Sequence, residues 1–503
     1  MQTRCLSIAK IVFFHDKHSV YNKKTQHIII LDFIFVLLQT IMNIRRLFIF
    51  ISLAFSCLAQ AQHISLETLK RIGLPVVVVE TIDAEEPSCE YLTIEDGYPG
   101  NTIRNATKVP GRVYVMEGND TIYDSGNYEE DISGMTIKLR GNSSAVIPDK
   151  KPFKIKLQKK ADMLGEDEKY NDKNWLLLKE EFPSLNLMVG LKVNELVGLQ
   201  WTPRFKYVNL LFNGDYRGVY MLCEAVNRNT DCRLDVSKNG FIFELDPYWW
   251  NEDVYFQSNV LGYKYTFKYP DAEDVTEEQL QYLIDFMSDV DNALYGNNYE
   301  KYIDIESFAS WMLGHDILGT YDASGSNIFF TKYDTLHSKL TMANMWDFDT
   351  IEMTPDTFSV IHDFDVHFLA LFQNPNETFI FAYINRWKEL SETLFDDMFQ
   401  FLDDFGKSPT ATALNKSMQM DYRRWETYGP TVAEFIASNK QWFAERKPYL
   451  DSAIHYMETT TAIKTPVILP KTNGKTYNLH GMPVQEDKYK GFIIKDGRLR
   501  ISK

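Results

Sequence analysis

Short runs of apolar residues, separated by turn residues, fill the chain from residue 74 to residue 139. Pro75-Val-Val-Val-Val-Glu80 and Gly111-Arg-Val-Tyr-Val-Met116 are two such runs, and Gly97-Tyr-Pro-Gly-Asn101 lies between them. Branched and aromatic residues in short runs, bounded by Gly, Pro and Asn, are typical of β-strands joined by tight turns. We therefore predict that this part of the chain is rich in β-structure.

A further strand is predicted from an alternating pattern that includes two lysines. In Lys151-Pro-Phe-Lys-Ile-Lys-Leu157, apolar residues alternate with Lys154 and Lys156. Because side chains alternate between the two faces of a strand, both lysines leave the same face of a half-buried strand. A helix is expected after it, over residues 185–199.

A β-hairpin is predicted where two apolar runs flank a tight turn. The runs cover residues 205–212 and 218–224, and the turn is Asn213-Gly214-Asp215. An Asn-Gly pair between two apolar runs is a strong hairpin signal, because both residues tolerate a positive φ.

Beyond Asp271 the pattern changes to helices, because apolar residues recur at three- and four-residue spacing. The helices are expected over residues 277–295, 305–319, 380–405 and 431–456. Two short segments, residues 327–333 and 340–349, lie among them. The predicted fold class is α+β: a two-lobed enzyme with a β-rich N-terminal half and a helical C-terminal half.

The first 61 residues differ from the rest of the chain. From Met42, a basic start at Arg45 and Arg46 precedes an apolar stretch and the small-x-small sequence Ala59-Gln60-Ala61, which is the pattern of a signal peptide. We expect residues 1–61 to be an upstream segment and a signal peptide, with Met42 as the true start. A genuine N-terminal anchor is the alternative, although the apolar run at residues 28–38 is short for a membrane span.

Composition limits the classes of protein that fit. The length of 503 residues allows two to four domains of roughly 100–200 residues each. An apolar content of 45% with 14% aromatic residues is that of a folded protein. The net charge of −16 argues against a nucleic-acid partner, since phosphate backbones need a basic face. Three cysteines follow residue 61, and we expect Cys223 to pair with Cys232.

The chain ends in a short β module that follows a Pro-containing linker. Strand-like runs cover residues 476–484 and 491–501. They resemble the C-terminal sorting tails of proteins exported by the type IX route, and a β extension packed on the main domain is the alternative. The predicted units are therefore residues 62–139, a β-rich subdomain; residues 140–460, a catalytic domain; and residues 461–503, the linker and tail.

Two acidic loops in the second half carry the main chemical signal. Tyr321-Asp-Ala-Ser-Gly-Ser-Asn327 holds Asp322 and Asn327, and Trp346-Asp-Phe-Asp349 follows with Asp347. Phosphoryl transfer needs a carboxylate to orient the acceptor hydroxyl and oxygen ligands for magnesium. An Asp-x4-Asn loop before an apolar-flanked Asp loop matches the loop order of protein kinases.

We therefore assign Asp322 as the catalytic base, and Asn327, Asp347 and Asp349 as metal ligands. A helix cap or turn-forming role is the alternative for each loop taken alone. A glycan hydrolase built on Asp347 and Asp349 is a further alternative.

Basic residues upstream are candidates for binding nucleotide phosphates. Lys156 is the first choice as the catalytic lysine, and Lys151 and Lys154 are further candidates. The turn Arg140-Gly-Asn142-Ser143-Ser144 is a candidate anion-binding turn through Arg140, Asn142 and Ser143. The alternative for the lysines is a solvated edge strand.

Six blocks, taken in order, resemble the CotH family of atypical secreted protein kinases. They are Arg140-Gly-Asn-Ser-Ser, Lys151-Pro-Phe-Lys-Ile-Lys-Leu, Asn174-Trp-Leu-Leu-Leu, Asn213-Gly-Asp-Tyr-Arg-Gly-Val-Tyr-Met-Leu-Cys-Glu224, Gly240-Phe-Ile-Phe-Glu-Leu-Asp246 and Trp346-Asp-Phe-Asp349. The resemblance implies ATP-dependent phosphorylation of protein serine or threonine on a reduced kinase-like fold with Mg²⁺ or Mn²⁺. It places the catalytic Asp at Asp322, the metal ligands at Asn327 and Asp347, and a nucleotide contact at Glu224.

The chain departs from the family at Asn186, where an Arg is expected. Two hypotheses follow: an exported kinase, or a kinase-like surface or envelope binding protein that has lost catalysis. The expected partners are a nucleotide and a protein substrate, with no nucleic acid and no integral membrane segment in the mature form. The expected state is a monomer in the periplasm, at the cell surface or in the medium.

Overall fold

The computed structural model describes residues 64–503, with gaps at residues 90–91, 94–100, 103–105, 142, 180–182, 353–354, 463–475, 479–482, 486–487, 489–490, 496–497 and 503. The predicted signal peptide lies outside these residues. Residues 65–503 form one of the two compact units of the chain. No helix in the described part of the chain is both long and apolar enough to cross a membrane.

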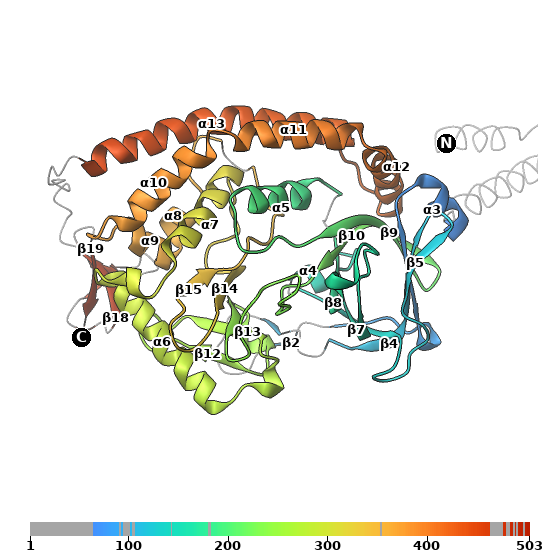
Figure 1. Cartoon of the computed structure of the whole chain (residues 1–503), viewed down its shortest axis with the longest axis horizontal. Coiled ribbons are helices and arrows are strands. Elements are labelled where there is room, and N and C mark those ends of the chain that lie inside the picture. Colours follow the sequence, from blue (N-terminus) through green and yellow to red (C-terminus); the bar gives the residue numbers. More distant parts are fainter. Residues whose placement is uncertain are drawn as a thin grey trace, which may run out of the picture. The chain divides into compact units, whose positions relative to one another are not determined.

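The N-terminal half contains a sheet of eight strands in the order β1-β9-β10-β8-β7-β6-β4-β5 (Figure 1). The strands are β1 (Val76–Thr81), β4 (Val109–Glu117), β5 (Asp120–Asp124), β6 (Met135–Leu139), β7 (Phe153–Ala161), β8 (Asp172–Leu178), β9 (Phe205–Phe212) and β10 (Asp215–Glu224). Strand β1 pairs with β4 on one side and with β9 on the other, so the sheet closes into a barrel. Alternate residues along the strands point inward and form a separate apolar core, which includes Val79, Ile137, Ile155 and Trp175.

The barrel corrects the predicted boundary between residues 139 and 140. Strand β6 pairs with β7 across that point, with Lys138 opposite Lys154. Strand β1 is likewise parallel to β9, with Val76 opposite Asn209. Residues on both sides of the boundary therefore build one barrel, and a β-rich region before residue 139 is not a separate subdomain.

The predicted hairpin is confirmed. Strands β9 and β10 are antiparallel, and the turn between them has Asn213 at φ 49° and Gly214 at φ 79°. Two positive φ angles in succession match the right-handed twist of the strands. The side-chain oxygen of Asn213 accepts a hydrogen bond from the backbone N–H of Thr81 at 2.9 Å, which ties the turn to the end of β1.

The second half has an antiparallel sheet of five strands in the order β12-β13-β11-β14-β15. The strands are β11 (Phe241–Leu245), β12 (Tyr255–Gln257), β13 (Lys264–Tyr269), β14 (Ile328–Lys332) and β15 (Leu340–Met342). Strand β11 occupies the centre of this sheet and pairs with both β13 and β14. The chain enters the sheet through β11 and returns to it through β14, after helices α6 (Glu277–Tyr295) and α7 (Ile305–Leu318).

Helices make up most of the remaining second half. They are α5 (Asn186–Leu196), α6 (Glu277–Tyr295), α7 (Ile305–Leu318), α8 (Ile361–Phe364), α9 (Val366–Phe372), α10 (Thr378–Leu390), α11 (Leu394–Lys407), α12 (Pro409–Arg424) and α13 (Val432–Ala462). Shorter elements near the N-terminus are α3 (Leu66–Ile72), β2 (Leu92–Thr93), β3 (Asn101–Thr102) and α4 (Ser143–Val146). The α+β class, with a β-rich first half and a helical second half, is confirmed.

The helix predictions hold with one exception. Helices α5, α6, α7 and α13 lie where apolar periodicity places them. The predicted helix over residues 380–405 is instead two helices, α10 and α11, which are separated at residues 391–393. Helix α12 was not predicted, although Ser408 at its N-cap and Pro409 at its first position are local start signals.

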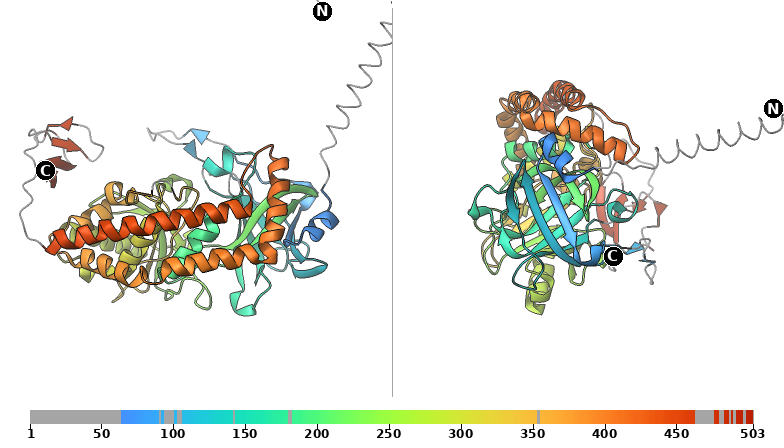
Figure 2. Two further views of the ribbon diagram at one scale, coloured as in Figure 1. Left: turned by 90° about the horizontal axis from the view of Figure 1, so that it is seen from above. Right: turned by 90° about the vertical axis from the view of Figure 1, so that its right-hand side faces the viewer.

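Helix α12 joins the helical half to the barrel through a buried ion pair. Lys150 Nζ lies 2.7 Å from Asp421 Oδ2, and the two side chains are 4% and 1% exposed. The backbone N–H of Val219 in β10 donates to the same oxygen at 2.6 Å. Helices α11 and α13 run side by side (Figure 2), and α12 packs against β10 of the barrel. The contact therefore positions one wall of the barrel against the helices.

The C-terminal β module contains β16 (Thr476–Asn478), β17 (Pro483–Val484), β18 (Gly491–Lys495) and β19 (Arg498–Ser502). In the described residues these strands pair only with one another, in the order β17-β16-β18-β19. The strands agree with the predicted β module, and its role in sorting stays a prediction.

The predicted pairing of Cys223 with Cys232 is wrong. Both residues, and Cys89, are free thiols. The side chain of Cys223 is buried on β10 and its Sγ donates to the backbone oxygen of Glu224 at 3.4 Å. Burial raises the pKa of the Cys232 thiol to about 11, so it is protonated at neutral pH.

The buried ion pair predicts a stability effect. Replacing Lys150 with Met leaves the Asp421 carboxylate buried beside β10 without its cation. We expect the free energy of unfolding to fall by about 3–5 kcal/mol, measured by urea denaturation. The control is Lys440→Met, which removes an exposed pair with Asp403 (N–O distance 2.8 Å) and should cost less than about 1 kcal/mol. Equal losses in the two variants would contradict the role assigned to Lys150.

Candidate functional site

A cleft of about 900 Å³ lies between the barrel and the second half. The barrel contributes β6, β7, β8, β9 and β10, and the rest of the chain contributes α5, β11, β13, β14 and two loops, after α7 and after β15. Its lining includes the predicted residues Arg140, Lys154, Asp322, Asn327, Asp347 and Asp349. Six predicted residues, which lie up to 209 positions apart in the sequence, therefore line one cleft.

Strand pairing brings the two acidic loops together. Asn327 directly precedes β14, and Asp347 follows β15 by five residues. The two strands are antiparallel, and the backbone N–H of Ala343 donates to the oxygen of Phe329 at 2.9 Å. As a result, Asn327 Nδ2 donates to Asp347 Oδ2 at 3.1 Å.

Both residues of this contact have a left-handed backbone conformation, which Asn and Asp adopt more readily than other residues except glycine. Asn327 has φ 58° and Asp347 has φ 60°, in the left-handed region. Such residues cost of the order of 1–3 kcal/mol each and persist only where the surroundings hold them. The carboxylate of Asp347 and the amide of Asn327 are therefore held in place before any ligand arrives.

Helix α5 provides much of that support. The side-chain oxygen of Asn194 accepts a hydrogen bond from the backbone N–H of Met345 at 2.7 Å, and both residues are fully buried. One turn earlier, Gly190 lies so close to the ring of Phe348 that a Cβ there would overlap it. The loop carrying Asp347 is thus fixed to α5 on both sides of the carboxylate.

Electrostatics favour a cation at the acidic end of the cleft. Burial raises the pKa of the Asp322 carboxyl, and the neighbouring charge of Asp347 raises it further. Burial also raises the pKa of Asp347, while Arg140 opposes that rise. Two carboxyl groups that disfavour each other's charge would be stabilised by a metal ion between them.

A magnesium ion fits this donor set. Among the residues that the structure describes, no three His, Cys, Asp or Glu side chains are grouped closely enough to hold a metal by themselves. Magnesium in phosphoryl-transfer sites keeps several waters and takes one or two carboxylates plus phosphate oxygens. Asp347, Asn327 and Asp349 supply ligands of that kind at one end of the cleft.

Basic residues also line the cleft. Lys138 and Lys154 are cross-strand partners on β6 and β7, and both line the cleft. Arg140 follows β6, and Lys268 on β13 forms an ion pair with Glu244 at 2.7 Å. Burial lowers the pKa of Lys154 to about 8, and the charges of Lys138 and Lys268 lower it in the same direction.

Several predicted binding residues lie outside the cleft lining. Lys156 is exposed two residues further along the same face of β7. Lys151 donates from Nζ to the backbone oxygen of Val146 at 2.8 Å instead. Asn142 and the side chain of Ser143 lie outside the described residues, whereas Gly141 and Ser144 of the same turn line the cleft. Asn186, where the chain departs from the family, is not a lining residue and begins α5.

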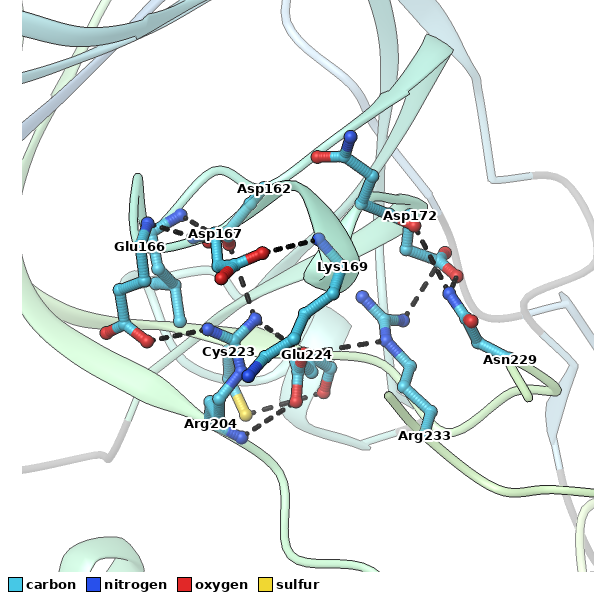
Figure 3. A network of polar contacts seen from close by, with 12 residues as sticks. Asp162, Glu166, Asp167, Lys169, Asp172, Arg204, Cys223, Glu224, Asn229 and Arg233 are labelled. Atoms are coloured by element: carbon cyan, nitrogen blue, oxygen red, sulfur yellow. Dashed lines mark hydrogen bonds and ion pairs between the residues drawn. The ribbon is translucent and has the colours of Figure 1, made fainter. Parts of the chain in front are cut away.

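Glu224 is buried and does not line the cleft. Its side chain is fully buried between two arginines, as Figure 3 shows. Arg204 NH2 lies 2.9 Å from Glu224 Oε1, and Arg233 Nε lies 3.8 Å from the same oxygen. Arg233 also forms an ion pair with Asp172 at 3.4 Å. The predicted nucleotide contact is therefore corrected: this carboxylate connects the end of β10 to neighbouring segments.

Sequence analysis missed Lys138 and the Lys268–Glu244 pair. Lys138 lies in Met135–Leu139, whose alternation places it on the outer face of a strand. That alternation is the signal that was available, but the pairing of this strand with the predicted strand that carries Lys154 was not predicted.

The site and the fold define a kinase-like protein. The model of the CotH kinase protein family matches residues 137–450. Because the match covers more than half of the chain, this chain belongs to the CotH kinase protein family.

Two solved structures are similar to this chain at low sequence identity. The crystal structure of the Helicobacter pylori proinflammatory kinase CtkA is similar, with a TM-score of 0.31 and 11% identity, over 62% of this chain and 95% of that chain. The structure of the Shewanella oneidensis MR-1 toxin–antitoxin system HipA, HipB and its operator DNA is similar, with a TM-score of 0.26 and 13% identity, over 59% of this chain and 62% of that chain. No curated protein matches the chain. The family assignment rests on the family match.

The contact between Gly190 and Phe348 predicts a specific loss. A methyl group in Gly190→Ala displaces the Phe348 ring, and with it the loop that positions Asp347. We expect nucleotide affinity in the presence of Mg²⁺ to fall at least about tenfold, measured by isothermal titration calorimetry. Gly406→Ala is the control, because its Cβ would meet only the flexible end of Ile436 at 2.9 Å. Unchanged affinity in Gly190→Ala would contradict the support assigned to α5.

Proposed function

We propose that this protein is an exported protein kinase that transfers the γ-phosphate of ATP to serine or threonine hydroxyls of a protein, with Mg²⁺ or Mn²⁺. One observation carries the proposal. Asp322, Asn327 and Asp347 come together in a cleft whose lining also includes Arg140, Lys138 and Lys154. Phosphoryl transfer requires both features in one site, acidic groups for the metal and cations for the phosphates.

Asp322 acts as the base for the acceptor hydroxyl. Its carboxylate takes the hydroxyl proton while the acceptor oxygen forms a bond to the γ-phosphorus, and the bond between that phosphorus and the bridging oxygen of ADP breaks. The raised pKa of Asp322 favours this role, since a carboxylate becomes a better proton acceptor as its pKa rises. The backbone N–H of Asp322 donates to Thr350 Oγ1 at 3.0 Å, which fixes the start of the loop.

The remaining residues bind and orient the nucleotide. Asp347, Asn327 and Asp349 would hold the metal, which when bound supplies charge neutralisation for the phosphate oxygens. Arg140 and Lys154 bind the phosphates from the barrel wall. Apolar lining residues, including Leu176, Ala225 and Val226, offer a surface for the base.

The cellular setting is part of the same proposal. The basic start, apolar stretch and small-residue site before residue 62 support export to the periplasm, cell surface or medium. The strand pattern of the C-terminal module supports sorting through the type IX route. A monomer that binds a nucleotide and a protein, and not nucleic acid or membrane, is the expected working form.

The test compares phosphate transfer in two variants. Asp322→Asn keeps the shape of the base but cannot accept the proton, so we expect kcat to fall about 10²- to 10⁴-fold with little change in the KM for ATP. Asp347→Asn should weaken nucleotide binding in the presence of metal as well. The measurement is incorporation of labelled phosphate into a mixture of candidate proteins and into the kinase itself.

The exposed carboxylate variant Asp403→Asn on α11 is the control and should retain wild-type transfer. Equal labelling by wild type and Asp322→Asn would overturn the proposal. Nucleotide binding without transfer in the wild type would instead support the alternative, a kinase-like binding protein that has lost catalysis.

A further inference from the structure

Helix α13 satisfies carbonyl groups at the C-terminal end of α7. The last four carbonyl groups of a helix have no partner within it and need donors from elsewhere. The backbone oxygen of Asp316 accepts a hydrogen bond from Arg446 Nε at 2.7 Å. The backbone oxygen of Ile317 accepts one from Trp442 Nε1 at 3.1 Å. Two side chains of α13 therefore fix the end of α7, which is shortly followed in the chain by Asp322.

Arg446 also holds a segment that follows the second acidic loop. We call residues 350–352 and 355–359 the anchor segment. Arg446 Nη1 donates to the backbone oxygens of Pro355 at 2.9 Å and of Thr357 at 2.5 Å. Because Arg446 is fully buried, water does not weaken these hydrogen bonds. One side chain thus joins the end of α7 to the anchor segment.

The anchor segment in turn contacts the loop that carries Asp322. The backbone N–H of Tyr321 donates to the backbone oxygen of Thr350 at 3.0 Å. The backbone N–H of Asp322 donates to Oγ1 of the same threonine at 3.0 Å. The backbone N–H of Glu352 donates to the oxygen of Leu318, the last residue of α7, at 2.7 Å. The start of the loop is therefore held both by the anchor segment and by the end of α7.

We propose that Arg446 is a positioning residue for phosphate transfer, because it ties α7 to the anchor segment and so fixes Asp322 relative to Asp347. The hydrogen bond from Asn327 to Asp347 fixes the end of the loop, and Arg446 supplies the constraint at its start. Among the described residues, none from α13 lines the cleft, so the helix acts only through the backbone that it holds. The role in transfer rests on the proposed function, whereas the tie between α7 and the anchor segment does not.

The geometry of the tie requires an arginine. Its guanidinium carries several N–H donors in one rigid plane, and here Nε serves Asp316 while Nη1 serves Pro355 and Thr357. A lysine would keep the positive charge, but all its donors lie on one nitrogen and cannot span the three carbonyl groups. Arg446→Lys should therefore loosen the tie and retain most of the packing.

The test measures phosphate transfer, nucleotide affinity and backbone protection in the full chain. In Arg446→Lys we expect the rate of labelled phosphate transfer at saturating ATP to fall about ten- to hundredfold, because a small displacement of a catalytic group is costly. The affinity for ATP with Mg²⁺, measured by calorimetry, should change less than about twofold, since the cleft lining is intact. Hydrogen exchange, measured by mass spectrometry, should become about tenfold faster in peptides that contain Tyr321, Asp322 and Glu352.

Two further variants make the test specific. Lys447→Met is the control, because Lys447 is next to Arg446 on α13 but forms an exposed ion pair with Asp451 at 2.8 Å. It should leave transfer, affinity and exchange as in the wild type. Trp442→Phe keeps an aromatic ring and removes the donor to Ile317, so it should change transfer and exchange in the same direction by a smaller factor. If circular dichroism shows that Arg446→Lys does not fold, Trp442→Phe decides the outcome in its place.

Wild-type transfer with wild-type exchange in folded Arg446→Lys would overturn the proposal. Slower transfer without faster exchange would also overturn it, and so would a loss of ATP affinity as large as the loss of transfer. If the wild type binds ATP but transfers no phosphate, the proposed kinase activity fails. Faster exchange at Tyr321 and Asp322 in Arg446→Lys would then still support the tie, and unchanged exchange would contradict it.

Discussion

The hydrogen bond between Asn327 and Asp347 is the contact on which the site depends. It joins two loops that are 20 residues apart, and both of its residues adopt left-handed backbone conformations. Such conformations are less favourable than helical or extended ones even for Asn and Asp, so the surrounding fold helps to hold them. Strands β14 and β15 do this from one side, and Asn194 and Gly190 of α5 do it from the other. The acidic end of the cleft is therefore a product of the sheet and of α5 together.

The basic wall has a different origin, which is the closure of the barrel. Because β1 pairs with both β4 and β9, each strand has a definite inner and outer face. The register between β6 and β7 then sets Lys138 opposite Lys154 on the outer face, where the cleft lies. The buried pair of Lys150 and Asp421 anchors this barrel to α12. The barrel is thus held to α12 and the loop of Asp347 to α5, and residues of both line one cleft.

Much of the fold could be predicted because it depends on local periodicity. The apolar runs on either side of Asn213-Gly214 were enough to predict the hairpin of β9 and β10. The three- and four-residue spacing of apolar residues was enough to predict α6 and α7. The break between α10 and α11 was missed because apolar residues continue across it in helical spacing. The boundary at residue 139 was misplaced because pairing between distant strands leaves no local trace. The predicted disulfide between Cys223 and Cys232 was wrong for the same reason, because spacing in the sequence does not decide which side chains come into contact.

The sequence by itself determined the α+β class, the order of the two loops and the residue types at the acidic end of the cleft, because these follow from local patterns. Tertiary structure alone decided which basic residues reach the cleft. Lys154 and Lys156 share a face of β7, yet only Lys154 lines the cleft. Glu224 ends an apolar run, which made it a candidate for contact with a nucleotide. In the structure its carboxylate lies between Arg204 and Arg233. A side chain's face is a property of its own strand, whereas its neighbours depend on strands and helices far away in the chain.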